Sequence, residues 1–248
     1  MEIKILVIGD SCEDVFIYGD IDRIAPEAPV PVIKPFKQKT NPGMASNVVE
    51  NLKAMSVKTD LITNEENIKK IRYVDYRYNQ MVLRIDENDK CERIDVSLLD
   101  LEKIENEYDA VIISDYNKGF LTEDDINFIS NVKCLKFLDT KKFLGEWCEN
   151  VDFIKINHQE HKKNFETIPK YPKLVDKLII TKGSKGCEHR NKIYSAEQVQ
   201  VRDASGAGDT FIAGLAYNYV TTNKIEKAIK FAQKCTKKVV QKTGVATI

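Results

Sequence analysis

Residues 203–214 read Asp-Ala-Ser-Gly-Ala-Gly-Asp-Thr-Phe-Ile-Ala-Gly, and the rest of the chain is interpreted from this stretch outward. Glycine permits tight turns and close approaches, so the N–H groups of Gly206, Ala207 and Gly208 are expected to open a helix and point outward. Such a helix N-terminus binds anions, phosphate above all. Asp209 lies in the same turn, where its charge would repel a resting phosphate. The pairing fits a phosphoryl-transfer centre in which Asp209 takes a proton from the attacking group.

A simpler interpretation of this stretch is a helix N-terminus with an acidic first turn, which is common in α/β proteins. Taken alone, the Gly-Ala-Gly-Asp pattern favours that simpler interpretation, because short motifs occur by chance. The choice between the two therefore depends on the remaining sequence.

The bulk composition bounds the class of protein. The 248 residues are 42% hydrophobic and 31% charged, which suits one large domain with a full core. Lys plus Arg equals Asp plus Glu at 38 each, a balance that argues against broad binding to nucleic acid or to an anionic membrane. The first apolar run is short and interrupted by charge, and no stretch approaches a membrane span, so we expect a cytoplasmic protein. The six cysteines show no CxxC spacing, so reduced thiols are expected.

Short apolar runs, each followed by polar residues and a turn, alternate with helical patterns along most of the chain. This rhythm predicts an α/β fold with a mostly parallel central sheet flanked by helices. Ligands bind outside the carboxyl ends of such strands, where Asp10 is placed after the first run, although a plain turn aspartate is as good an interpretation. The expected strands cover residues 3–8, 58–62, 110–116, 135–141, 153–157 and 177–183.

Two segments break this rhythm. Residues 12–36 contain four prolines that forbid a helix, while Val30, Val32 and Phe36 alternate like an edge strand. Residues 71–95 begin with two runs that alternate apolar and polar, as half-buried strands do. Together these segments predict a small β lid over a pocket. Between them, residues 41–47 are expected to open a helix, where Asn47 can bind a hydroxyl or serve as a cap.

Four motifs in this order and spacing carry a resemblance to a known family. They are Asp-Ala-Ser-Gly-Ala-Gly-Asp-Thr-Phe at 203–211, Asn-Pro-Gly-Met-Ala-Ser-Asn at 41–47, Asn-x-x-Glu at 157–160 and Thr-Lys-Gly-Ser-Lys-Gly at 181–186. Together they resemble the signatures of the ribokinase-like (PfkB) carbohydrate kinases. The resemblance covers essentially the whole chain and implies a single ribokinase-like domain at 1–248, with lid segments near 12–36 and 71–95.

One branch of that family is more similar than the others. The stretch Arg-Ile-Ala-Pro-Glu-Ala-Pro-Val-Pro at 23–31 resembles the kinase domain of D-glycero-β-D-manno-heptose-7-phosphate kinases, as do shorter motifs at 9–10, 18–19, 79–80, 84–86, 114–119 and 139–141. This resemblance implies ATP-dependent phosphorylation of the anomeric hydroxyl of the heptose 7-phosphate. The product would be the 1,7-bisphosphate used for ADP-heptose.

The resemblance also implies roles for individual residues. Asp209 would be the base, and Gly206, Ala207 and Gly208 would form the anion hole. ATP and magnesium are the implied cofactors, and a need for a monovalent cation stays open. Asn157 and Glu160 would help place magnesium through water, because magnesium sheds its waters reluctantly. The implied nucleotide-binding residues are Asn157, Glu160, Thr181, Gly183 and Gly186.

On the acceptor side, the resemblance implies contacts between the sugar and four residues. These are Asp10, Gly43, Asn47 and Arg84. The cations considered for the phosphate of a sugar phosphate are Arg23, Arg72 and Arg84. A homodimer is expected through the open edge of the lid sheet.

Two departures from the family pattern keep alternatives open. Met44 replaces the second glycine of the N-terminal signature and is expected to crowd the sugar. The segment between Ile62 and Ile71 is short, so either the sheet has lost an edge or the lid is reduced. The alternatives are a kinase for another small sugar or a nucleoside, and a regulator that binds nucleotide or sugar without turnover.

Overall fold

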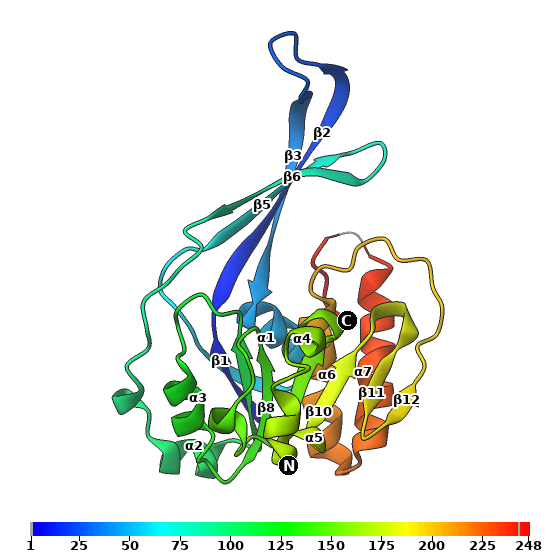
Figure 1. Cartoon of the computed structure of the whole chain (residues 1–248). Coiled ribbons are helices and arrows are strands. Elements are labelled where there is room, and N and C mark those ends of the chain that lie inside the picture. Colours follow the sequence, from blue (N-terminus) through cyan, green and yellow to red (C-terminus); the bar gives the residue numbers. More distant parts are fainter. Residues whose placement is uncertain (1, 243) are drawn as a thin grey trace.

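The central feature of the fold is an eight-stranded sheet, seen in a computed structural model that describes residues 2–242 and 244–248 (Figure 1). Its strand order is β12-β11-β10-β9-β8-β7-β1-β4. The pairs from β4 to β10 are parallel, and the β11–β12 hairpin joins β10 antiparallel, which confirms the predicted mostly parallel sheet. The strands are β1 (Lys4–Gly9), β4 (Lys58–Ile62), β7 (Ala110–Asp115), β8 (Leu135–Thr140), β9 (Phe153–Asn157), β10 (Leu178–Thr181), β11 (Cys187–His189) and β12 (Lys192–Tyr194).

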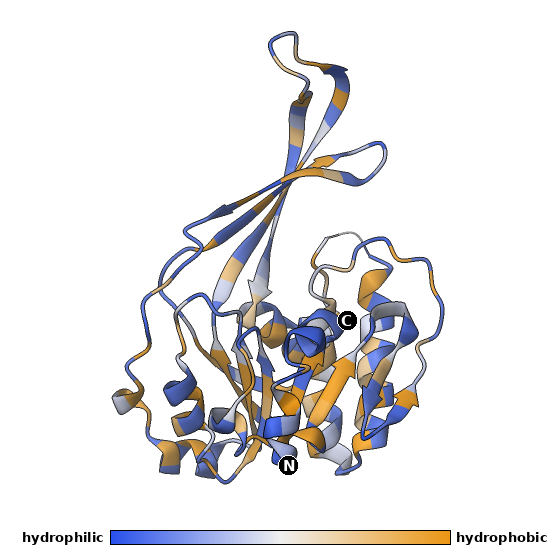
Figure 2. Cartoon of the chain, viewed as in Figure 1, coloured by the Kyte–Doolittle hydropathy of each residue, from blue (hydrophilic) through white to orange (hydrophobic). Residues whose placement is uncertain are grey.

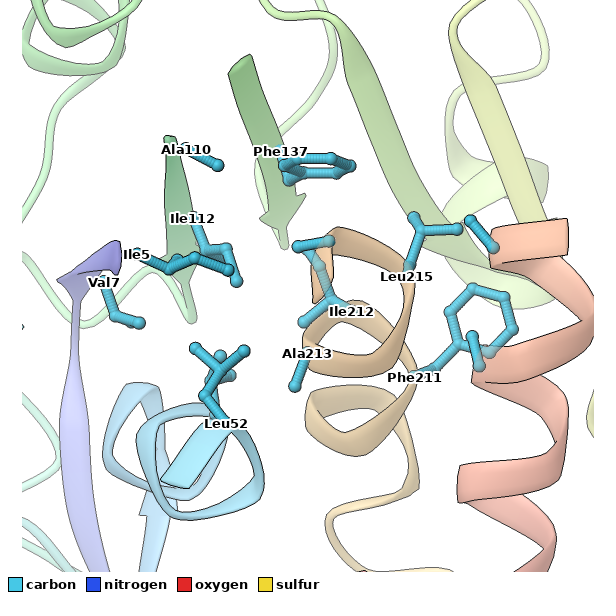
Figure 3. Packing of buried hydrophobic residues seen from close by; sticks show 14 of the residues in the cluster. Ile5, Val7, Leu52, Ala110, Ile112, Phe137, Phe211, Ile212, Ala213 and Leu215 are labelled. Carbon is cyan, nitrogen blue, oxygen red and sulfur yellow. The ribbon is translucent and has the colours of Figure 1, made fainter. Parts of the chain in front are cut away.

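Helices cover both faces of this sheet because its strands are apolar on both sides. In β1, Ile5 and Val7 pack toward α1 (Ala45–Ala54), α6 (Ala207–Thr222) and α7 (Ile225–Val240) (Figure 3). Leu6 and Ile8 face the opposite cluster, built with α2 (Leu101–Glu107), α3 (Glu123–Ile129) and α5 (Pro172–Val175). Strands buried on both faces read as continuous apolar runs, which is why the sequence located them. The short helix α4 (His158–Lys163) follows β9 directly.

Helix α6 lies between α1 and α7, and this packing fixes the position of its N-terminus. Residues 209–216 are all buried, with Ile212, Ala213 and Leu215 directed into the core (Figure 3). Gly214 permits the close approach of α7, since a Cβ there would lie 3.2 Å from the Cα of Ala232. The glycine turn is thereby held where the parallel strands end.

A second sheet of four strands projects from the body of the molecule (Figure 1). Its order is β3-β2-β5-β6, built from β2 (Ser11–Ile24), β3 (Pro31–Met44), β5 (Lys69–Asp75) and β6 (Gln80–Glu87). The prolines of β3 are tolerated because β3 is an edge strand. The prediction that residues 41–47 open a helix is wrong for 41–44, which complete β3, and helix α1 begins at Ala45.

The chain passes from β4 to β5 through residues 63–68 without a further strand of the main sheet, so β4 forms an edge of that sheet. The projecting sheet has four strands, and the short segment adds no strand beyond β4. In the described part of the chain, none of the helices combines the length and the apolar character needed to cross a bilayer.

Candidate active site

The glycine turn forms the N-terminus of α6, as the sequence predicted, but its amides are not all available. Gly206 adopts φ 76°, a left-handed conformation that favours glycine. The N–H of Ala207 donates to the carbonyl of Ala204 at 3.2 Å. The N–H groups of Gly206 and Gly208 have no acceptor among the described residues. The turn therefore offers the Gly206 and Gly208 amides to an anion, while the Ala207 amide serves to close the turn.

Asp209 is held by a hydrogen-bond donor on each of its carboxylate oxygens. The Tyr116 hydroxyl donates to Oδ1 at 2.6 Å and the Asn47 side-chain amide donates to Oδ2 at 2.8 Å. Burial raises the pKa of Asp209 to about 6, against the lowering effect of these two hydrogen bonds. A carboxylate whose pKa lies just below neutral is ionised at pH 7 and still accepts a proton readily, as a general base requires.

A buried chain of side chains supports this arrangement from helix α1. Thr210 donates to Asn51 at 3.1 Å, and Asn51 donates to Asn47 Oδ1 at 3.1 Å. Asn47, predicted to contact the sugar, thus has its amide oxygen and one amide hydrogen engaged within the protein. Its position identifies it as a support for Asp209.

Replacement of Gly206 by Ala is expected to disturb this support. A Cβ at Gly206 would lie 2.5 Å from Asn47 Nδ2, so Asn47 must move away from Asp209. We expect kcat to fall about tenfold or more, because a displaced base loses alignment with its substrate. Steady-state kinetics measures this. Gly244→Ala is the matched control, since Gly244 also has a positive φ of 79° but a Cβ there meets nothing closer than 3.7 Å. Equal losses in both variants would show that backbone strain alone is responsible.

Lys155 lies next to the glycine turn, in a buried charge network that also contains Lys141. The Lys155 ammonium is 2.7 Å from Asp139, and a Cβ at Gly208 would lie 2.8 Å from the same ammonium. Lys141 bridges Asp139 at 3.2 Å and Glu160 at 2.7 Å. Burial acts to raise the pKa of Asp139, but Lys141 and Lys155 outweigh it and the pKa is lowered. The network places positive charge beside the amides that are free for an anion.

Asn157 and Glu160, predicted to act on magnesium, close the N-terminus of α4 as a capping box. Asn157 Oδ1 accepts the N–H groups of Gln159 and Glu160, and Glu160 Oε2 accepts the N–H of Asn157 at 2.6 Å. Glu160 Oε1 is paired with Lys141. No cluster of three potential metal-ligating side chains occurs in residues 2–242 and 244–248. These groups fit a magnesium ion that is carried by nucleotide phosphates and reached through water, rather than a protein cage.

A cavity of about 490 Å³ opens on one side of the glycine turn. It is lined by the predicted nucleotide residues Thr181, Gly183 and Gly186 together with Ala207 and Gly208. The structure thus brings these residues to the amides of the α6 N-terminus. Asn157 and Glu160 are not part of this lining. Its apolar wall, suited to a flat heterocycle, comprises Val199, Val201, Phe211 and Val240.

A second cavity of about 460 Å³ lies on the other side of the turn, beneath the projecting sheet. Asp209 and Gly206 line it, whereas Gly208 lines the first cavity. The two cavities therefore meet at the Gly206–Asp209 turn, with room for a donor on one side and an acceptor on the other. The other lining residues are Asp14, Met44, Lys70, Arg72, Arg84, Tyr116, Asp203, Ala204 and Ser205.

The cations of this acceptor cavity differ in their partners. Arg72 forms an ion pair with Asp14, and Arg84 binds both oxygens of Asp86 at 2.6 and 2.8 Å. Lys70 is 7% exposed and has no carboxylate partner within the described residues. Arg23, also considered for the phosphate, is exposed at the outer end of β2 and does not line the cavity.

Asp10 and Gly43, two further residues predicted to contact the sugar, make their contacts within the protein. Asp10 is 0% exposed, and its carboxylate accepts the backbone N–H groups of residues 116, 118 and 120 at 2.6, 3.3 and 3.4 Å, which fixes the turn after β7. Burial raises its pKa. Gly43 permits Asp14 to approach, since a Cβ there would lie 2.3 Å from Asp14 Oδ2. Neither Asp10 nor Gly43 lines the acceptor cavity.

Met44 has a backbone conformation that favours glycine. Its φ is 59°, a value that strains a side-chain-bearing residue. The side chain packs with Cys12 and Ile68 and lines the acceptor cavity. Met44 therefore lies at the wall of this cavity, and crowding of a sugar by its side chain stays a prediction.

Asp14, Lys70 and Tyr116 are the cavity residues that the sequence did not single out for a role. The sequence does contain a pattern that could have identified Asp14 and Lys70. Along β2, Asp14 shares its buried face with Cys12 and Phe16, and along β5, Lys70 shares its buried face with Ile68 and Val74. A charge on the buried face of a strand indicates a ligand site or an ion pair.

Comparisons with known proteins identify a matching family and fold. The profile of the pfkB family carbohydrate kinases matches residues 43–248. Among curated relatives, the bifunctional protein HldE of Sulfurimonas denitrificans is 31% identical over 296 aligned positions, covering 99% of this chain and 62% of the relative. HldE of Campylobacter jejuni strain RM1221 is also 31% identical, with coverage of 99% and 62%. The chain thus spans about 62% of the length of these relatives.

Solved structures show the same fold. The ribokinase of Thermotoga maritima superposes with a TM-score of 0.70 at 17% identity, covering 98% of this chain and 94% of that one. The Arabidopsis thaliana ribokinase complexed with ribose and ATP gives a TM-score of 0.71 at 18% identity, with coverage of 98% and 94%. At these identities the match concerns the fold alone, which is the ribokinase-like α/β fold.

Proposed function

This chain belongs to the pfkB family of carbohydrate kinases, which transfer phosphate from ATP to a sugar, and we propose that its acceptor is the anomeric hydroxyl of D-glycero-D-manno-heptose 7-phosphate. The observation that carries the choice of a phosphorylated sugar is Lys70, a buried cation in the acceptor cavity without a carboxylate partner. The similarity to the HldE proteins and the motif at residues 23–31 support the heptose.

The charge of Lys70 is the reason for a phosphate on the acceptor. Removing an ammonium from water is costly unless an anion compensates it. Arg72 and Arg84 form ion pairs with Asp14 and Asp86, whereas Lys70 forms none among the described residues. Asp86 lies opposite Lys70 in the β5–β6 pairing, but its two oxygens are taken by Arg84. A sugar phosphate supplies about two negative charges at neutral pH and would satisfy Lys70 when it binds. Arg84, which the sequence predicted to bind the substrate, is already paired with Asp86. We therefore propose Lys70 ahead of Arg84 as the contact of the sugar phosphate.

The proposed reaction uses the groups at the junction of the two cavities. Asp209 accepts the proton of the anomeric hydroxyl as the sugar oxygen bonds to the γ-phosphorus of ATP. The bond from that phosphorus to the β–γ bridging oxygen breaks, and ADP leaves. The amides of Gly206 and Gly208 and the Lys155 ammonium stabilise the charge on the transferring phosphoryl group. The products are the heptose 1,7-bisphosphate, ADP and the proton held by Asp209.

On the donor side, we place ATP in the cavity lined by Thr181, Gly183 and Gly186, with its γ-phosphate at the glycine turn. Magnesium bound to the phosphates would neutralise part of their charge. Asn157 and Glu160 lie beside Lys141 and are the groups that would reach the hydrated ion. Within the acceptor cavity, Asp14 Oδ2 is the carboxylate oxygen proposed to accept a sugar hydroxyl, since Oδ1 is paired with Arg72.

The test is ATP consumption with a panel of acceptors: the heptose 7-phosphate, the same heptose without phosphate, ribose, fructose 6-phosphate and a nucleoside. We expect kcat/KM to be highest for the heptose 7-phosphate. A higher value for ribose or a nucleoside would replace this acceptor with one of the alternatives left open by Met44. Binding of ATP with no turnover of any acceptor would favour a non-catalytic regulator.

We also propose a homodimer that pairs through the projecting sheet. In β6, Arg84 lines the acceptor cavity, so its neighbours Leu83 and Ile85 lie on the opposite face, where they are 52% and 38% exposed. Hydrophobic positions alternate with hydrophilic ones along the projecting sheet (Figure 2). Exposed apolar residues on a sheet face are typical of an interface. Light scattering measures the mass: about twice 28.4 kDa supports the dimer, and a monomer at assay concentrations contradicts it.

A further inference from the structure

Tyr116 occupies a position between the acceptor cavity and the charge network, and the reaction described above assigns it no role. It follows β7 directly, where the chain turns through Asn117 with φ 58°. Its backbone N–H donates to the buried Asp10 carboxylate at 2.6 Å. The buried aspartate therefore fixes the backbone from which the tyrosine side chain extends.

Two lysine ammonium groups lie close to the ring of Tyr116. The Lys70 ammonium is 5.4 Å from the ring centroid and the Lys141 ammonium is 4.9 Å from it. Cations at these distances are attracted to the face of an aromatic ring. The ring also packs against the cluster of Cys12, Met44 and Ile68. These contacts leave the hydroxyl a narrow range of positions.

The Tyr116 hydroxyl donates a hydrogen bond to Asp209. Its 2.6 Å contact to Oδ1 is short, as expected when a neutral hydroxyl donates to an ionised carboxylate. Burial and the neighbouring Asp209 charge raise the pKa of Tyr116 well above its usual value, so it stays a donor through the physiological range. A carboxylate has about four lone-pair sites, so Oδ1 can accept the substrate hydroxyl beside that of Tyr116.

We propose that Tyr116 is a positioning residue for the base: its hydroxyl fixes the orientation of the Asp209 carboxylate and stabilises its ionised form. The proposal rests on the proposed function, because it takes Asp209 to be the base. Asn47 holds the other oxygen, so the two donors together define the plane of the carboxylate. Tyr116 differs from Asn47 in that it also lines the acceptor cavity, where it reaches both the base and Lys70.

Other charged groups around Asp209 also influence its pKa, so a variant that tests Tyr116 must leave these groups unchanged. They come from the projecting sheet, from the strands beneath the turn and from the turn itself. The titratable and charged groups around Asp209 are Cys12, Asp14, Lys70, Arg72, Arg84, Asp139, Lys155 and Asp203, with Lys141 paired to Asp139 behind them. Tyr116→Phe alters none of these side chains.

The experiment is the titration of Asp209 by carboxyl-carbon NMR in the ligand-free protein, for wild type and Tyr116→Phe. Loss of a hydrogen bond to the ionised form raises the pKa of a carboxylic acid, so we expect Asp209 to titrate about one to two pH units higher in the variant. Tyr108→Phe is the matched control. Tyr108 donates to Asp60 at 2.7 Å at the opposite end of β7, and its loss should leave Asp209 unchanged.

The pH profile of kcat/KM provides the second readout. In Tyr116→Phe, the acid limb should move upward with the Asp209 pKa, giving about a tenfold loss at pH 6 that is largely recovered at pH 9. A loss of equal size at every pH, with Asp209 titrating as in wild type, would overturn the proposal. If no acceptor is phosphorylated, the proposed function fails, and the NMR titration still decides the role of Tyr116.

Discussion

Asp209→Asn is expected to lower kcat by about 100- to 10,000-fold, with the KM for ATP within about threefold of wild type. The side chain keeps its size but loses the ability to accept a proton, while the amides of Gly206 and Gly208 still bind the nucleotide phosphates. Steady-state kinetics with varied ATP and varied acceptor measures both constants. The matched control is Asp124→Asn, which replaces an exposed aspartate in the first turn of α3 and should retain wild-type kinetics.

The stability of the same variant shows whether it is folded. Burial raises the pKa of Asp209 to about 6 in the folded protein, above its unfolded value, so its contribution to stability is present at low pH and lost as pH rises through about 6. Ionised Asp209 thus costs about 3 kcal/mol near pH 7.5. Asp209→Asn should therefore unfold at no lower urea concentration than wild type at pH 7.5. A destabilised variant would attribute the kinetic loss to misfolding, and wild-type turnover would contradict the assignment of the base.

Lys70→Met is expected to raise the KM for the sugar phosphate between about tenfold and one-hundredfold, because a charge-assisted contact in a buried site contributes about 1.5–3 kcal/mol. The long apolar side chain keeps most of the packing of Lys70 and removes its charge. The KM for the heptose without phosphate should change little. The ratio of the two constants, measured in one assay series, isolates the contact with the phosphate.

Lys69→Met is the control for this experiment. Lys69 is the neighbouring residue in β5 and lies on the opposite face of the sheet, because side chains alternate along a strand. Its loss should leave both KM values near wild type. Equal increases for the phosphorylated and unphosphorylated sugars in Lys70→Met would contradict the assignment of Lys70 to the phosphate.

The main sheet could be predicted from the sequence because its strands are buried on both faces. Continuous apolar runs such as residues 110–115 admit few other interpretations when helices alternate with them. The glycine turn could also be predicted, because a glycine that precedes an apolar helix is typical of a turn with positive φ, and Gly206 has this conformation. The sequence thus located Asp209 and the strand ends around it.

The projecting sheet could not be oriented from its pattern. Ile71, Arg72 and Tyr73 alternate, and an ordinary half-buried strand would turn the apolar residues inward. Here Arg72 faces inward with Lys70, because the inner face of this sheet lines a cavity as well as a small apolar cluster. The rule that places apolar residues inside therefore gives no signal for Lys70, and the role of Arg84 stays a prediction.

Polar residues at strand ends show a second limit of sequence patterns. An aspartate after a strand predicts a ligand contact, but the same residue type also satisfies backbone N–H groups. In this structure Asp10 fixes the turn of Tyr116, while Asn157 and Glu160 cap α4 and stay predicted contacts of hydrated magnesium. A motif specifies which polar atoms are present, and the surrounding backbone decides how many remain for a ligand.

The central claim is that the enzyme phosphorylates the anomeric oxygen of a sugar 7-phosphate. Phosphorus NMR of a mixture of enzyme, ATP, magnesium and D-glycero-D-manno-heptose 7-phosphate tests it most directly. The expected spectrum shows one new phosphate resonance, coupled to the anomeric proton, for each ADP formed, while the 7-phosphate resonance persists. Formation of ADP without that resonance, coupling of the new phosphate to another carbon-bound proton, or an unchanged spectrum would contradict the claim.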